Sequence, residues 1–190
     1  MKALGVRLPA NFHRTLAAGT ALILGCGVSI PAGAAQVTVS NLQAVARSLA
    51  FVETLRHHDT VVLGIVYAPN DPTAKAAAED AVQLLQTVPG PNSTRLQGIA
   101  ISADALATSS EHADALFLML GTAKFSTTIL NAMHRDALVS VSDDPACLDN
   151  GSCVLMVRTD PAVEIVLNTE LAAAVGARFS AVFTMMVKRK

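Results

Sequence analysis

One run of β-branched and apolar residues constrains the fold more than any other feature of this chain. Residues 60–67 have the sequence Thr-Val-Val-Leu-Gly-Ile-Val-Tyr, which is apolar at nearly every position rather than at alternate ones. A strand with one solvated face alternates apolar and polar residues, whereas a strand of a parallel sheet is covered on both faces. The run therefore predicts a central strand of a parallel sheet, whose strands need helices to connect them.

The segments around this run supply such connections. Ser40 is a good cap for a helix running to about residue 56, and Asp71 followed by Pro72 predicts the start of a second helix. The other predicted elements are strands over 96–101, 115–120 and 137–142, a helix over 122–133, a hairpin of 154–159 with 163–167, and a last helical region from 168 or 169. This alternation predicts a three-layer, Rossmann-like α/β domain with a mostly parallel sheet and a C-terminal antiparallel hairpin.

The first 35 residues have the character of an export signal. Residues 1–14 contain basic residues and no acid, and an apolar run that ends at Pro31 follows. The run is shorter than the roughly 20 residues that a membrane-spanning helix needs, and residues 32–35 offer small side chains for cleavage. We therefore expect a signal peptide over 1–35, an exported domain over 36–190, and no stable membrane insertion after cleavage. An uncleaved anchor and a lipoprotein attached at Cys26 are the alternatives.

Composition and charge exclude several classes of protein. Hydrophobic residues make up 52% of the chain and charged residues 15%, which is incompatible with intrinsic disorder. Removing residues 1–35 takes away three of the 14 basic residues and none of the 15 acidic ones, which leaves a net charge of −4. A mildly acidic domain with no Trp and a single Tyr lacks both the basic patch and the stacking surface of a nucleic-acid binder.

Two cysteines remain after the leader is removed. Cys147 and Cys153 bracket a turn-rich loop that contains Gly151, and an even cysteine count in an oxidising compartment favours a disulfide. No other Cys or His lies within ten residues of the pair, and the spacing is not that of a catalytic Cys-x-x-Cys motif. A local disulfide is therefore expected rather than a metal site or a redox centre.

Ligands of an open parallel sheet bind beyond the carboxyl ends of its strands. The residues that lie at or just after the carboxyl ends of the predicted strands and form the candidate ligand loops are Asn70, Asp71, Ser102, Gly121, Thr122, Ser142 and Asp143. These loops contain no glycine-rich phosphate cradle, no nucleophile elbow and no metal-ligand spacing. We therefore expect no enzyme activity, no cofactor and no metal, and turn formation is an alternative role for Asp143 and its neighbour Asp144.

Four apolar residues near the C-terminus recur at helical spacing. Phe179, Val182, Phe183 and Met186 fall at i, i+3, i+4 and i+7, which predicts one apolar face of a helix. This face is expected either to join the core or to form a surface for a partner or a homodimer. The cations at 188–190 are expected to lie at the C-terminal end of the same helix, where they complement its dipole.

Residues 138–147, 153–157 and 163–180 combine a strand that ends in a Ser-Asp-x-Pro turn, a short loop, an antiparallel strand pair and a last helical segment. This combination resembles the YfiR/HmsC-like family of small periplasmic proteins, and in layout the resemblance extends over about residues 38–188. The residues that match the family pattern are Ser142, Asp143, Pro145, Asn168, Gly176 and Ser180. The chain departs from the pattern after its first helix, where residues 51–56 are not aromatic-rich, and it lacks the cysteines of an earlier disulfide found in some members.

The resemblance implies a function exerted by contact. Members of the family hold an inner-membrane diguanylate cyclase inactive by binding its periplasmic domain, which lowers cyclic di-GMP and biofilm formation, and they respond to redox conditions through disulfides. A different class of function remains open at this point, namely a periplasmic solute-binding module that uses Asn70, Ser102, Thr122 and Ser142 to hold a small ligand.

Overall fold

The computed structural model describes residues 37–108 and 112–190. The predicted signal peptide and its cleavage site lie outside the described residues. Among the described residues, no helix is both long enough and apolar enough to cross a membrane.

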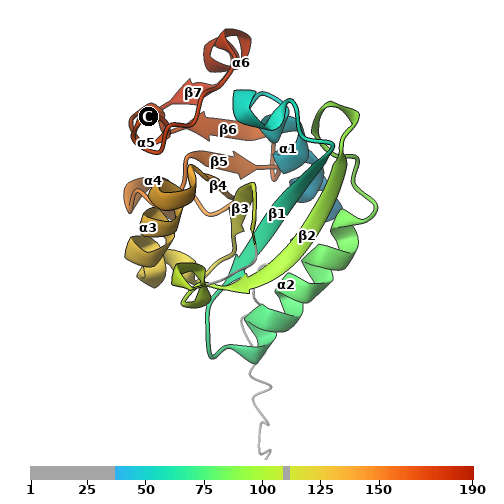
Figure 1. The fold of residues 1–190 in the computed structure, drawn as a ribbon, viewed down its shortest axis with the longest axis vertical. Helices are drawn as coiled ribbons and strands as arrows, with labels where there is room; N and C mark the ends of the chain where they lie inside the picture. Colours follow the sequence, from blue (N-terminus) through green and yellow to red (C-terminus); the bar gives the residue numbers. More distant parts are fainter. Residues whose placement is uncertain (1–36, 109–111) are drawn as a thin grey trace, which may run out of the picture. The chain divides into compact units, whose positions relative to one another are not determined.

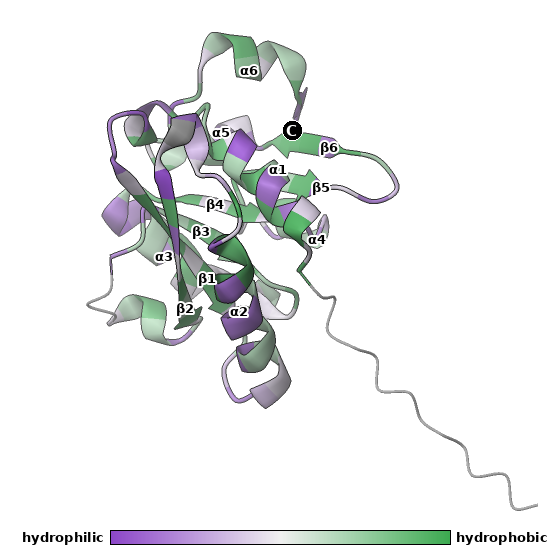
Figure 2. Cartoon of the chain, turned by 90° about the vertical axis from the view of Figure 1, so that its right-hand side faces the viewer, coloured by the Kyte–Doolittle hydropathy of each residue, from purple (hydrophilic) through white to green (hydrophobic). Residues whose placement is uncertain are grey.

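A seven-stranded sheet forms the centre of the domain (Figure 1). Its order is β2-β1-β3-β4-β5-β6-β7, and all neighbours are parallel except β5 and β6. The strands are β1 (Thr60–Tyr67), β2 (Arg95–Ser102), β3 (Ala115–Leu118), β4 (Val139–Ser142), β5 (Leu155–Arg158), β6 (Glu164–Leu167) and β7 (Lys188–Arg189). The helices α1 and α2 lie on one side of the sheet and α3 on the other, as both ribbon views show (Figures 1 and 2). The predicted three-layer α/β fold with a C-terminal hairpin is confirmed.

Helices and short 3-10 turns (η) connect the strands. The α-helices are α1 (Val39–Leu49), α2 (Pro72–Leu85), α3 (Ser126–Asp136), α4 (Ala146–Asp149), α5 (Thr169–Ala174) and α6 (Ala181–Met186). The 3-10 turns are η1 (Glu53–Leu55), η2 (Pro91–Ser93), η3 (Ala105–Ala107) and η4 (Thr122–Phe125). The predicted start of α2 is confirmed, because Asp71 caps it and Pro72 occupies its first turn.

The first helix is shorter than its sequence pattern predicts. Thr38 rather than Ser40 caps α1, and the helix ends at Leu49 instead of continuing to about residue 56. After this end, Val52 forms an antiparallel bridge with Phe179. The backbone N–H of Glu53 donates to the Arg178 carbonyl at 2.8 Å. Pairing with a distant segment therefore replaces the last predicted turns of the helix.

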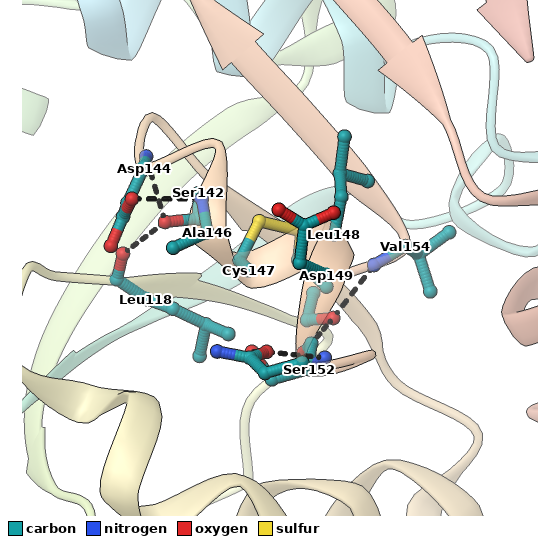
Figure 3. The surroundings of a disulfide bond; sticks show 12 residues. Leu118, Ser142, Asp144, Ala146, Cys147, Leu148, Asp149, Ser152 and Val154 are labelled. Carbon is teal, nitrogen blue, oxygen red and sulfur yellow. Dashed lines mark hydrogen bonds between the residues drawn. A yellow bond between two sulfur atoms is a disulfide. The ribbon is translucent and has the colours of Figure 1, made fainter. Parts of the chain in front are cut away.

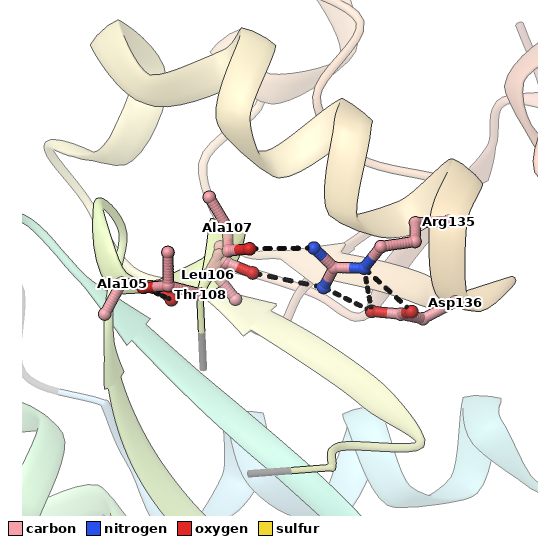
Figure 4. Close-up of polar contacts among 6 residues, drawn as sticks. All are labelled: Ala105, Leu106, Ala107, Thr108, Arg135 and Asp136. Carbon is pink, nitrogen blue, oxygen red and sulfur yellow. Dashed lines mark hydrogen bonds and ion pairs between the residues drawn. The ribbon is translucent and has the colours of Figure 1, made fainter. Parts of the chain in front are cut away.

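A single arginine connects α3 to the turn that precedes β3. Arg135 donates to the carbonyl oxygens of Ala107 at 3.1 Å and Leu106 at 3.2 Å, and it forms an ion pair with Asp136 at 2.6 Å (Figure 4). Two backbone acceptors of η3 are thereby satisfied by one planar guanidinium group. These contacts fix the position of η3 against the C-terminal end of α3.

The prediction of one apolar helical face over residues 179–186 is wrong in its geometry. The helix α6 begins only at Ala181, because the Ser180 hydroxyl caps it by accepting from the Phe183 N–H. Phe179 precedes the helix and pairs with Val52 instead. Of the remaining residues, Phe183 is 1% exposed, whereas Val182 is 57% and Met186 65% exposed.

The C-terminal cations also differ from their predicted position. Lys188 and Arg189 form β7, which pairs parallel to β6, so they do not continue a helix. The backbone N–H of Lys190 donates to the Leu167 carbonyl at 2.9 Å, which extends this pairing. The end of the chain therefore supplies the edge strand on this side of the sheet.

Candidate functional site

Three of the predicted ligand-loop residues line one cavity at the carboxyl ends of β1 and β2. The cavity has a volume of about 440 Å³. Its lining residues are Tyr67, Pro69, Asn70, Asp71, Pro72, Lys75, Ser102 and Asp104. The cavity lies on the carboxyl side of the sheet, where ligands of open parallel sheets bind, but the strand order changes direction between β1 and β3 and not between β1 and β2.

The polar groups of this cavity are largely engaged in local structure. The Asp71 carboxylate accepts from the Thr73 hydroxyl at 2.6 Å and from the N–H groups of Thr73 and Ala74 at 3.0 and 3.1 Å. These bonds, first of all the one from the Thr73 hydroxyl, lower the pKa of Asp71. The Ser102 hydroxyl donates to the Asp104 carboxylate at 2.5 Å. Asp71 and Ser102 thus serve the start of α2 and the turn after β2.

The other predicted ligand residues lie outside this cavity and support the backbone. The buried Thr122 hydroxyl donates to the Met119 carbonyl at 2.8 Å, after Gly121 has turned the chain with a φ of 91°. The buried Ser142 hydroxyl donates to the Leu118 carbonyl, also at 2.8 Å. The structure therefore does not bring all seven predicted ligand residues together.

Asp143 belongs to a separate polar cluster that joins the start of α1 to the end of β4. Asn41 donates through Nδ2 to Asp143 at 3.1 Å and accepts through Oδ1 from the Thr159 hydroxyl at 3.0 Å and from Thr38. Burial raises the pKa of Asp143, and the neighbouring Asp144 carboxylate raises it further. The cluster connects three segments that are far apart in the sequence.

The raised pKa of Asp143 predicts a dependence of stability on pH. An acid whose pKa is higher in the folded state makes folding less favourable once it ionises, so the free energy of unfolding falls as pH rises above the ordinary value of 3.8. Asp143→Asn should remove this decrease and keep the acceptor oxygen for Asn41. Urea unfolding of both proteins from acidic to neutral pH measures the difference. Parallel pH profiles of the two proteins would contradict the prediction.

An apolar cavity near the C-terminus, which no motif predicted, lies between the β5–β6 hairpin and α6. Its volume is about 510 Å³. Its lining residues are Phe51, Arg158, Pro161, Ala162, Val163, Glu164, Ile165, Phe183, Met186, Val187 and Lys188. These residues come from three separate segments, so no local pattern reveals the cavity. Two of its lining residues, Phe183 and Met186, belong to the apolar face that helical spacing predicted, and Val163 beside the Pro161 turn is 68% exposed.

Stacked phenylalanines form the floor of this region. The Phe183 ring lies 4.8 Å from the Phe51 ring and 5.4 Å from the Phe179 ring, with interplanar angles of 20° and 18°. Such offset aromatic pairs add stability beyond their burial. The stack joins the segment after α1 to α6.

A group of charges borders the same cavity. Glu164 forms ion pairs with Lys188 at 2.6 Å and with Arg158 at 2.5 Å. The hydrogen bond from Lys188 and then that from Arg158 lower the pKa of Glu164. One carboxylate between two cations leaves this edge of the cavity with an excess of positive charge.

Exposed apolar side chains extend from the cavity over α6. Met185 is 78% exposed, and Val182 and Met186 are also more than half exposed. Figure 2 shows α6 at the top of the view in the colours of mainly apolar residues. We call Val163, Val182, Met185 and Met186 the C-terminal apolar face. Two residues of the predicted partner face, Val182 and Met186, belong to it, whereas Phe183 is part of its floor.

The predicted disulfide is present in the structure. Cys147 and Cys153 are bonded, with their Cα atoms 5.3 Å apart, and both are buried (Figure 3). Cys147 lies in α4 and Cys153 follows the turn at Gly151, whose φ is 69°. The bond closes the loop between β4 and β5.

The family-motif residues have local structural roles. Asn168 caps α5 by accepting from the Leu171 N–H at 3.0 Å. Gly176 adopts a φ of 74°, which favours glycine, and Ser180 caps α6. In the part of the chain that the structure describes, no group of three or more His, Cys, Asp or Glu residues is placed to hold a metal ion.

Comparisons with known proteins agree with this architecture. A family model described as YfiR/HmsC-like matches residues 83–186. Two solved structures are similar in fold. One is the ABC domain in complex with L-Trp from Streptococcus pneumoniae (11% identity, TM-score 0.54), and the other is a conserved domain protein from Vibrio cholerae O1 biovar El Tor (12% identity, TM-score 0.55).

These structural similarities cover 80% of this chain and 59% and 60% of the other two chains. This chain therefore spans about three fifths of the length of those structures. A comparison with curated proteins gives no match. At these identities the two structures support the fold alone.

Proposed function

The chain belongs to the YfiR/HmsC-like family, and from this membership we propose that it is a periplasmic regulatory protein that represses an inner-membrane diguanylate cyclase. In this proposal residues 1–35 direct export and are removed. The domain then binds the periplasmic domain of the cyclase, which lowers cyclic di-GMP and biofilm formation. The protein acts by contact, without a catalytic step or a cofactor.

The C-terminal apolar face is the observation that supports a contact function. Large contiguous apolar patches are rare on monomeric proteins, and those that occur commonly mark a binding site for a partner or a ligand. Here Val163 and Met186 border a cavity of about 510 Å³, and Met185, which precedes Met186 in α6, is 78% exposed. The Arg158 and Lys188 cations at the rim favour a partner segment that combines an apolar anchor with an acidic group.

Met186→Asp is expected to abolish repression without unfolding the protein. Met186 is 65% exposed, so the domain tolerates a charge there, whereas a partner that buries the side chain does not. We expect the affinity for the cyclase periplasmic domain to fall by about tenfold or more. The measurement is cyclic di-GMP in cells that express the cyclase with wild-type or variant chain, together with binding of the purified cyclase domain.

Leu120→Asp provides the matched control. Leu120 is an exposed apolar residue, 52% exposed, in the loop after β3 and outside the C-terminal apolar face. The Leu120→Asp chain should repress like the wild type.

Repression by a chain that lacks residues 1–35 and remains in the cytoplasm would contradict the periplasmic part of the proposal.

A periplasmic solute-binding module is the second candidate function. The cavity at the carboxyl ends of β1 and β2, with Asn70 and Ser102 in its wall, favours it. The same experiment separates the two candidates. If Met186→Asp represses as well as the wild type while Asn70→Ala and Ser102→Ala abolish the response, the solute-binding function replaces the first proposal.

A further inference from the structure

The two edges of the sheet differ in how they are protected. Exposed strand edges tend to pair with other chains, and proteins protect them with short strands, charges, prolines or bulges. The edge strand β7 has two residues, both basic. The opposite edge strand, β2, has eight residues, and Arg95 is its only charged residue. It contains no proline, and its register with β1 is uninterrupted.

The backbone of β2 offers an open row of hydrogen-bonding groups. The N–H of Arg95 donates to the Asp59 carbonyl at 3.0 Å, and the N–H of Ala103 donates to the Tyr67 carbonyl at 2.9 Å. Both bonds point toward β1. Because the direction alternates along a strand, the even-numbered residues point their N–H and C=O groups away from β1. These residues are Leu96, Gly98, Ala100 and Ser102.

Nothing in the described parts of the chain pairs with this side of β2. The strand lies at the end of the sheet order, and Figure 1 shows it at the right-hand edge beside β1. The Ile99 side chain in the middle of the strand is half-buried. The edge therefore combines free backbone groups with incompletely covered apolar surface.

We propose that β2 pairs antiparallel with β2 of a second copy of this chain, so that the two sheets become continuous. A two-fold axis perpendicular to the sheet keeps paired side chains on the same face, and it requires even-numbered residues to pair with even-numbered ones. Placing the axis at Ile99 pairs Leu96 with Ser102 and Gly98 with Ala100. In this register all four outward-pointing residues of each copy have a partner.

Charge complementarity supports a second copy as the occupant. The same register places Arg95 opposite Ala103 of the other copy, next to Asp104. Both Arg95 and Asp104 are exposed, and neither takes part in an ion pair within the described residues. The pairing thus brings one cation and one carboxylate together at each end, and it places Ile99 against its own equivalent.

Engineered cysteines test the register directly. Ile99→Cys places two thiols opposite each other at a Cα separation of about 4.5 Å, within the range for a disulfide. Gln97→Cys is the matched control on the same strand and face, because its two copies would lie about 13 Å apart along the strand. The full chain is expressed, recovered from the envelope and run on a non-reducing gel. We expect a cross-linked dimer from Ile99→Cys alone, and a wild-type lane reports any link through Cys26.

Ala100→Pro tests the hydrogen bonds. The N–H of Ala100 points away from β1, so proline removes a donor that only the second copy uses. Because each dimer contains the change twice, the dissociation constant measured by light scattering should rise about thirtyfold. A wild-type protein that is monomeric at high concentration, or equal cross-linking at 97 and 99, would overturn the proposal. Neither result would affect the repression test, which concerns the opposite end of the sheet.

Discussion

Phe183→Ala is expected to lower the free energy of unfolding by about 3–5 kcal/mol. The Phe183 side chain is 1% exposed and stacks on both Phe51 and Phe179. Truncation leaves a cavity at the place where α6 joins the segment after α1, and both neighbouring rings lose their partner. Because that segment is also held by the bridge between Val52 and Phe179, little collapse into the cavity is expected.

Urea unfolding followed by circular dichroism measures this loss. Met185→Ala is the control on the same helix, since Met185 is 78% exposed and its truncation should change the free energy of unfolding by less than about 0.5 kcal/mol. Equal losses in the two variants would show that α6 packs only weakly on the domain. A large loss in Phe183→Ala alone confirms that α6 is part of the core and that only its outer side is free for a partner.

The sequence predicted those elements whose signals are local. The apolar run at 60–67 predicted β1, and Asp71 with Pro72 predicted the start of α2, because caps and periodicity act within a few residues. The disulfide was predictable in the same way, from two cysteines on either side of a turn. Each of these features depends on neighbours in the chain.

The features that were missed depend on contacts between distant segments. Helical spacing from Phe179 to Met186 predicted one face, but pairing of Phe179 with Val52 delays the start of α6 to Ala181. Lys188 and Arg189 likewise pair with β6, a distant segment, instead of continuing the helix. The apolar cavity combines Phe51, the β5–β6 hairpin and α6, so it exists only once the domain has folded. Tertiary pairing overrode local periodicity in each case.

The candidate ligand loops illustrate a different limit. The sequence placed small polar residues at the ends of the strands, and in the structure Thr122 lies in η4 after β3 while Ser142 is the last residue of β4. It also shows that their hydroxyls donate to the carbonyls of Met119 and Leu118. A sequence pattern gives the residue type, whereas the hydrogen-bond partner follows only from the folded backbone.

Replacing both Cys147 and Cys153 by alanine is expected to cost about 2–3 kcal/mol of unfolding free energy. The bond closes a short loop, with a sequence separation of 6, and thereby restricts the unfolded chain. In the folded state this loop leads directly into β5, and β5 pairs with β4 through only two residue pairs. The Ser140 hydroxyl donates to the Ser152 carbonyl and accepts from the Val154 N–H, both at 3.0 Å, so the loop and the strand are held at one point.

Reduction provides the internal control for this prediction. Dithiothreitol should lower the urea midpoint of the wild-type protein toward that of the double variant, and it should leave the double variant unchanged. An unchanged wild-type midpoint after complete reduction would show that the hydrogen bonds of Ser140 alone hold the loop. A drop in both proteins would trace the effect to something other than this bond. β5 leads into the β5–β6 hairpin, which lines the apolar cavity. Loosening the loop should therefore also weaken the proposed binding to the cyclase, and a binding assay on the same reduced samples measures this effect.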